Sequence, residues 1–144
     1  MMLVGLFAAA LIAGQTQTPA PGPAPRSMVV VREADVMVEQ SPPPHAGVGR
    51  STAFRLSDAA PGRNFEFRKR ILHPGASIGL HVLTHDEVYY VVSGEGEVAS
   101  DGRTQTISSE TAAYLYEGAD VGIRQTGTEP LVLIIAYPLA ARTR

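Results

Sequence analysis

The sequence contains no cysteine, which excludes disulfide bonds, thiolate metal ligands and a cysteine nucleophile. It also has no excess of positive charge, since 12 Lys and Arg stand against 14 Asp and Glu. A nucleic-acid or anionic-membrane partner would require a clear basic excess. No glycine-rich phosphate loop between a strand and a helix is present. These absences argue against nucleic-acid binding, nucleotide use and cysteine hydrolase chemistry.

A long hydrophobic run is also missing. The apolar segment 3–13 is too short to span a bilayer, which takes about 20 residues. It matches the hydrophobic part of a secretory signal, with Ala13 and Gly14 near a cleavage point, although no Lys or Arg precedes it. An uncleaved anchor and a misassigned start are the alternatives. We expect a signal peptide over 1–18, a Pro-rich linker over 19–27 and export to the periplasm or medium, with no stable membrane anchor after cleavage.

The rest of the chain, 28–144, is expected to form one domain, because 44% hydrophobic residues in 144 suffice for a single core. Its apolar and alternating runs are short, no window has a helical period, and no segment repeats. Many short strands predict an all-β sandwich or barrel. The expected strands are 28–32, 36–39, 51–56, 64–72, 77–83, 88–93, 96–100, 103–107, 112–116, 121–126 and 131–137.

The segment 75–96 carries the most specific pattern. Side chains alternate faces along a strand, so His81 and Leu83 point the same way, and a turn at 84–86 returns Glu87 beside them. An imidazole and a carboxylate that converge inside a barrel are the beginning of a divalent-metal site.

The spacing of Gly75, His81, Glu87 and Gly94 resembles the first motif of the cupin superfamily: Gly, five residues, His-x-His, three or four residues, Glu, six residues, Gly. The resemblance extends over about 48–137. It implies a single cupin jelly-roll β-barrel. It also implies a homodimer that pairs through edge strands and an N-terminal strand, for which the apolar run 28–31 is suitable.

The ligand positions depart from this family pattern. Leu83 replaces the second histidine, and Val121 stands where the second motif has its histidine. That motif falls on Glu110, Tyr116, Gly118, Val121 and Gln125, of which only Gly118 agrees. Leucine and valine have no lone pair for a metal. The remaining candidate ligands are His81, Glu87 and, from the turn, His85, a two-histidine, one-carboxylate set for Fe, Mn, Ni, Cu or Zn.

Each of these ligands also has a simpler interpretation. His85 fits a polar turn residue that faces solvent. His81 fits a buried histidine hydrogen-bonded to Glu87, with no metal bound at all. Leu83, Val121, Tyr89 and Tyr114 are candidate ligand-binding residues, although the tyrosines fit core or rim packing equally well.

Three further positions stay open. His45, in a Pro-rich connection, is placed to close the barrel mouth. Arg68 and Arg70 alternate with phenylalanines, so their face is either solvated or, if interior, suited to an anionic ligand.

Three functions are compatible with this pattern. The first is an exported cupin that holds a small molecule in its barrel, with a reduced or absent metal site. The second is a divalent-metal-dependent dioxygenase, isomerase or lyase that acts on a small polar substrate through His81 and Glu87. The third is metal-free acid–base chemistry by the same pair. The fold alone does not choose among them.

Overall fold

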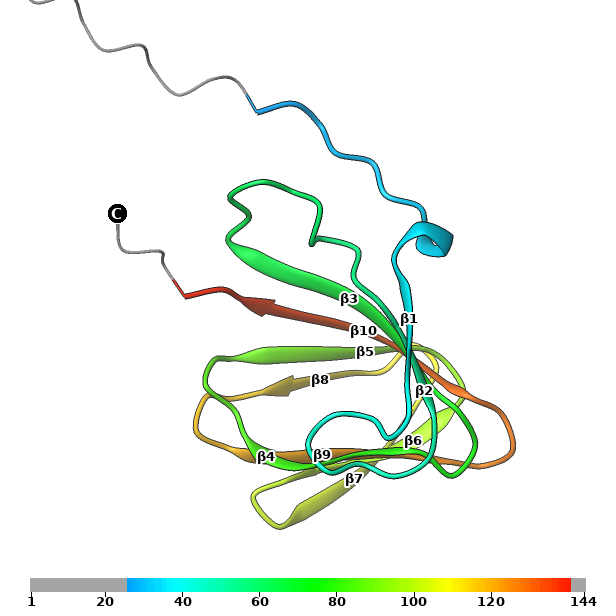
Figure 1. Cartoon of the computed structure of the whole chain (residues 1–144). Coiled ribbons are helices and arrows are strands. Elements are labelled where there is room, and N and C mark those ends of the chain that lie inside the picture. The colour runs from blue at the N-terminus through cyan, green and yellow to red at the C-terminus, as the bar shows by residue number, and fades with distance from the viewer. Residues whose placement is uncertain (1–25, 141–144) are drawn as a thin grey trace, which may run out of the picture.

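A computed structural model describes residues 26–140, which form one 3-10 turn and ten strands (Figure 1). No helix in this part of the chain is long and apolar enough to cross a membrane. The elements are η1 (Glu33–Asp35), β1 (Met37–Gln40), β2 (Ser51–Phe54), β3 (Phe65–Leu72), β4 (Ser77–Val82), β5 (Glu87–Ser93), β6 (Glu95–Ser100), β7 (Arg103–Ser108), β8 (Ala112–Leu115), β9 (Asp120–Thr126) and β10 (Leu131–Pro138).

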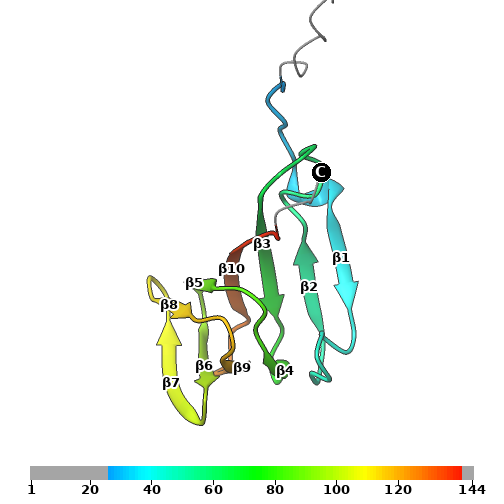
Figure 2. The same ribbon diagram turned by 90° about the vertical axis from the view of Figure 1, so that its left-hand side faces the viewer.

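The strands form two antiparallel sheets that face each other. One sheet has the order β1-β2-β3-β10-β5-β8 and the other the order β4-β9-β6-β7. Figures 1 and 2 show the sheets as two layers, with consecutive strands such as β3 and β4 passing from one layer to the other. This confirms the expected all-β, jelly-roll architecture.

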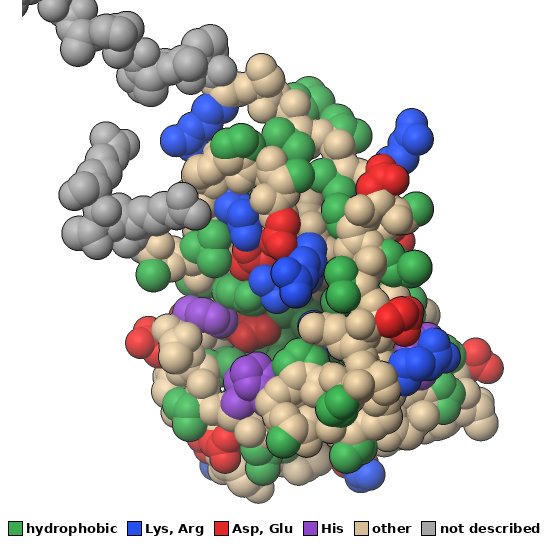
Figure 3. Space-filling view, viewed as in Figure 1, with side chains coloured by type: hydrophobic (Ala, Val, Ile, Leu, Met, Phe, Trp, Pro, Cys, Tyr) green, Lys and Arg blue, Asp and Glu red, His purple; other side chains and the backbone are tan. Residues whose placement is uncertain are grey.

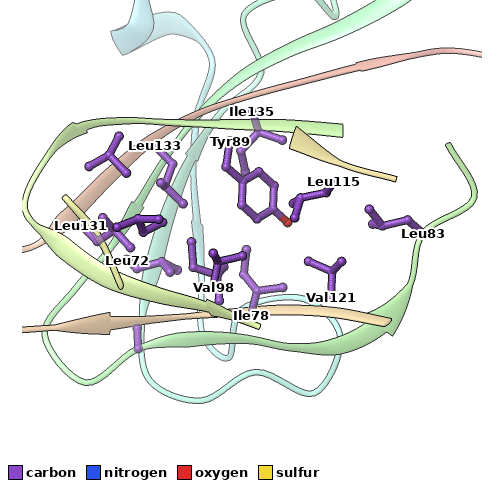
Figure 4. Close-up of a cluster of buried hydrophobic side chains, with 14 of the residues drawn as sticks. Leu72, Ile78, Leu83, Tyr89, Val98, Leu115, Val121, Leu131, Leu133 and Ile135 are labelled. Carbon is purple, nitrogen blue, oxygen red and sulfur yellow. The ribbon is translucent and has the colours of Figure 1, made fainter. Parts of the chain in front are cut away.

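The hydrophobic core fills the space between the two sheets. Leu72, Val91, Val121, Leu131 and Leu133 have no exposed surface. Figure 4 shows apolar side chains such as Leu72, Val121 and Leu133 reaching toward one another from both layers, with Tyr89 between them. Burial of this apolar surface is the main force that holds the sheets together.

Ten of the eleven expected strands are present, with ends shifted by one or two residues. The exception is 28–32, which forms no strand and leaves Met28 and Val30 largely exposed. The expectation was wrong because the edge of the six-stranded sheet is occupied by β1, and no strand within residues 26–140 lies beside 28–32. The homodimer stays a prediction. The expected signal peptide and most of the linker lie outside the described residues.

The orientation of β3 is what positions the site. Its charged residues Glu66 and Arg70 are buried, whereas Phe65 and Phe67 are 54% and 40% exposed. The strand is therefore turned opposite to the usual arrangement, in which polar residues face water and apolar residues face the core. Because of this, two arginines enter the interior of the barrel.

Candidate functional site

A cavity of about 310 Å³ opens between the two sheets. The six-stranded sheet lines it with charged and aromatic side chains, and the other side is formed by β4, the turn after it and the loop 41–50. Figure 3 shows its mouth as a hollow, with Lys and Arg side chains above and His side chains at its border. From the six-stranded sheet come Arg68, Arg70, Glu87, Tyr89, Ile135 and Tyr137. We call this cavity the barrel pocket.

Two arginines of β3 supply positive charge to the barrel pocket. Arg68 is paired, because its Nε donates to Oε2 of Glu66 at 2.8 Å. Arg70 is only 6% exposed, and its Nη1 donates to Oε1 of Gln40 at 2.7 Å and to Oγ of Ser51 at 3.0 Å. Among residues 26–140, Arg70 forms no ion pair. It is a buried cation with neutral hydrogen-bond partners.

Burial of the positive charge of Arg70 is energetically unfavourable. Burial lowers the pKa of its guanidinium, and the neighbouring charge of Arg68 lowers it further. A guanidinium nevertheless stays protonated in proteins. A buried charge is normally compensated by a partner of opposite sign. The barrel pocket therefore favours an anionic ligand beside Arg70.

Of the residues that the structure describes, Glu87 on β5 alone contributes a carboxylate to the lining of the barrel pocket. Burial raises its pKa to about 7, although the nearby charges of Arg68 and Arg70 act in the opposite direction. Near neutral pH a large share of this carboxyl is protonated. In that form it is uncharged and can donate a hydrogen bond to an anion.

His45 and His81 form a stacked pair at the side of the barrel pocket. Their ring centroids are 3.7 Å apart and the rings are nearly parallel, at 5°. Nδ1 of His81 bonds the carbonyl oxygen of Gly79 at 2.9 Å. Burial lowers the pKa of His45, and the charges of His81 and Arg70 add to this effect. The expected hydrogen bond between His81 and Glu87 is not formed.

Glycines allow the loop 41–50 to bring His45 to this place. A Cβ on Gly79 would lie 1.9 Å from the carbonyl oxygen of His45, and one on Gly47 would lie 2.0 Å from that of Ser77. Both distances are far shorter than any non-bonded contact of a Cβ atom, so a side chain at either glycine would clash with the backbone. The loop and β4 therefore touch through bare backbone. The sequence left open whether His45 lies at the barrel mouth and did not reveal its partner.

His85 lies in the bend after β4, and its half-buried ring lines the barrel pocket. Its ring stacks on Tyr137 with centroids 4.1 Å apart. The guanidinium of Arg68 lies 5.6 Å from the centroid of the same tyrosine. Stacking on the ring of Tyr137, which lies on β10, keeps the imidazole of His85 in the barrel pocket.

The three expected metal ligands, His81, His85 and Glu87, all line the barrel pocket. They do not assemble, since no three His, Cys, Asp or Glu side chains within residues 26–140 form a group that could hold a metal ion. His81 and His85 are instead engaged in ring stacking. The two positions at which the family pattern has further histidines, Leu83 and Val121, are apolar and buried. This donor set does not fit a family-type metal centre.

Of the four expected ligand-binding residues, two line the barrel pocket and two do not. Leu83 and Tyr89 line the barrel pocket. Val121 pairs with His81 across the sheet but is fully buried in the core. Tyr114, on the edge strand β8, is 56% exposed, and its hydroxyl donates to Oδ2 of Asp86 at 2.5 Å. Neither Val121 nor Tyr114 is among the pocket-lining side chains, because the first packs inward against the core and the second points outward.

Comparisons with known proteins agree with this architecture. The family described as "Cupin domain" matches residues 69–137. The chain is 27% identical over 106 residues to an oxalate-binding protein of Thermotoga maritima, which covers 72% of this chain and 88% of the relative.

Solved structures give the same result. The crystal structure of a predicted oxalate decarboxylase from T. maritima superposes with a TM-score of 0.68 and 27% identity, covering 78% of this chain and 99% of that one. A Cupin 2 conserved barrel domain protein from Salinispora arenicola gives a TM-score of 0.57 with 26% identity, covering 63% and 77%.

Proposed function

Since the chain belongs to the cupins, as a small single-barrel member, we propose that it binds the carboxylate of a small organic anion in the barrel pocket. The observation that carries this proposal is Arg70, a buried cation without an anionic partner in residues 26–140. The relative named for binding oxalate supports a carboxylate as the ligand group.

The hydrogen-bonding groups of the barrel pocket suit a carboxylate. Arg70 uses Nη1 for its bonds to Gln40 and Ser51, which fixes the guanidinium in place. Its Nε and Nη2 remain for the ligand, and a planar guanidinium binds a carboxylate through two parallel hydrogen bonds. Protonated Glu87 provides a further donor. A fixed fork of this kind selects for geometry as well as for charge.

Titration calorimetry with oxalate and with its neutral diamide, oxamide, tests the proposal. We expect oxalate to bind at least about tenfold more tightly, because a charged hydrogen bond contributes roughly 1.5–3 kcal/mol. Equal binding of the two compounds would contradict a carboxylate site.

The titration of Glu87 gives a stability prediction. In the unfolded chain its pKa is near 4.5, and in the folded protein it is about 7, so the folded state binds more protons between these values. The free energy of unfolding therefore falls as pH rises from about 4.5 to 7, by roughly 3 kcal/mol for this group. Glu87→Gln, which cannot ionise, is expected to lose this part of the slope.

The measurement is urea denaturation of both proteins at several pH values, with a chelator present. Other groups titrate in the same range, so the difference between wild type and Glu87→Gln is the quantity to compare. Identical slopes for the two proteins would show that the carboxyl of Glu87 has an ordinary pKa.

A metal-dependent enzyme is the second candidate, because His81, His85 and Glu87 line one cavity. To act as ligands, His81 and His85 would have to leave their stacking partners, His45 and Tyr137. The calorimetric titration is therefore repeated with chelator. Unchanged carboxylate binding supports a site built from Arg70, whereas binding that is lost with chelator and restored by Mn²⁺ favours the metal-dependent function.

A further inference from the structure

The barrel pocket is large for a ligand made only of carboxylates. Its volume of about 310 Å³ corresponds to roughly ten water molecules, at ~30 Å³ each. A cavity of roughly 150 Å³ already accepts benzene. Oxalate, two carboxylates joined directly, would leave much of this space to water. The volume fits a ligand that has a body in addition to its carboxylate.

The charges of the barrel pocket fit a single carboxylate. Arg68 is already paired with Glu66 at 2.8 Å, so Arg70 is the cation in the barrel pocket that lacks an ionic partner. A second carboxylate on the ligand would thus enter a largely buried space without a cation of its own, at a considerable desolvation cost.

Part of the barrel pocket wall across from β3 is apolar, beside the polar side chains of His45, His81 and His85. Ile78 on β4 and Leu83 after it are buried, at 6% and 3% exposure, and both line the cavity. Ile135 and Tyr89, from the six-stranded sheet, extend this surface between the two sides. In Figure 4 Ile78, Leu83 and Tyr89 border the space between the layers. A polar group placed against Ile78 and Leu83 would lose its water without gaining a hydrogen bond from these side chains.

From these three observations we propose that the ligand is a monocarboxylate with an apolar planar body, an aromatic carboxylate of the benzoate class, rather than a compact dianion. The carboxylate lies at Arg70 and the ring lies against Ile78 and Leu83. This inference rests on the proposed carboxylate site and adds the class of ligand. The parallel stacks of His45 on His81 and of His85 on Tyr137 offer flat walls that suit a planar ring.

Calorimetric titration of the full chain with benzoate, benzamide and oxalate tests it. Benzoate is expected to bind at least about tenfold more tightly than oxalate, because each buried CH₂-sized group strengthens binding roughly fourfold. Benzamide, which keeps the ring and lacks the charge, is expected to bind at least about tenfold more weakly than benzoate.

Two variants of Leu83 locate the ring. Leu83→Asn places a polar group on the apolar wall and is expected to reduce the benzoate-to-oxalate affinity ratio by about tenfold. Leu83→Met keeps the wall apolar and similar in volume, so the ratio should stay near that of wild type. If Leu83→Asn does not fold, the wild-type comparison of benzoate with oxalate still decides the matter.

The outcomes separate the two proposals. If oxalate binds as tightly as benzoate and its binding depends on Arg70, the proposal of an aromatic ligand is wrong. The proposed carboxylate site is still supported in that case. If neither benzoate nor oxalate binds, or if both still bind to a variant that lacks Arg70, the proposed carboxylate site is wrong. The proposal of an aromatic ligand is then wrong as well.

Discussion

Arg70→Gln is expected to weaken carboxylate binding by at least about a hundredfold, the largest effect on binding that we predict. The substitution removes a buried charge and the two-donor fork that faces the ligand. Glutamine can still donate to Ser51 or Gln40, so the local fold should be preserved. Arg70→Lys keeps the charge but loses the fork, and an intermediate affinity is expected.

Arg124→Gln is the matched control. This arginine lies on the outer face of β9, where its Nη2 pairs with Oε2 of Glu97 at 2.6 Å. Calorimetry should show binding unchanged within about twofold, because a distant exposed charge contributes little to a buried site. Wild-type affinity in Arg70→Gln, or an equal loss in Arg124→Gln, would show that the anion binds elsewhere or through net charge alone.

Glu66→Gln is expected to destabilise the fold by about 3 kcal/mol, the largest effect on stability that we predict. Glu66 is 1% exposed, and its two oxygens accept hydrogen bonds from Arg63 Nε and Arg68 Nε, both at 2.8 Å. Burial by itself would raise the pKa of this carboxyl, but the bonds to Arg68 and Arg63 outweigh burial and lower it. Without the negative charge, Arg68 faces Arg70 inside the barrel with no compensation.

Urea denaturation at pH 7 measures this loss, and Glu97→Gln is the control. Glu97 forms a more exposed pair with Arg124, so its removal should cost less than about 1 kcal/mol. Similar losses in the two variants would mean that Glu66 acts as an ordinary surface charge and does not organise the pocket arginines.

The sequence predicted the barrel well because its signals are local. Ten strands followed from short apolar runs bounded by Gly, Pro and Asp. The spacing from Gly75 to Gly94 placed His81 and Glu87 in one cavity. Even the departures at Leu83 and Val121 were informative, since both side chains are buried and apolar in the fold.

The site was harder to predict because its residues meet only in three dimensions. The turn at Pro74-Gly75 broke the alternation of faces, so the orientation of Arg70 did not follow from that of His81. The alternation of Phe65 and Phe67 with charged residues was visible, but it left open which of the two faces is buried. The buried face of β3 is fixed by its place between β2 and β10 and by the second sheet that packs against this one.

The histidines illustrate the same limit. His45 lies 36 positions before His81 in the sequence. Its ring stacks on His81 because the loop 41–50 packs directly against the backbone of Gly79, which has no side chain in the way. His85 turns inward because Tyr137, contributed by the last strand, offers a flat ring. Neither contact leaves a pattern in the sequence near the residue concerned.

A crystal structure of the full chain with benzoate or oxalate, whichever binds more tightly, tests the central claim most directly. We predict that the ligand carboxylate lies within hydrogen-bonding distance of the Arg70 guanidinium, in the barrel pocket between the two sheets. A ligand bound to a metal ion held by His81, His85 and Glu87, or one seated outside this pocket, would contradict the account.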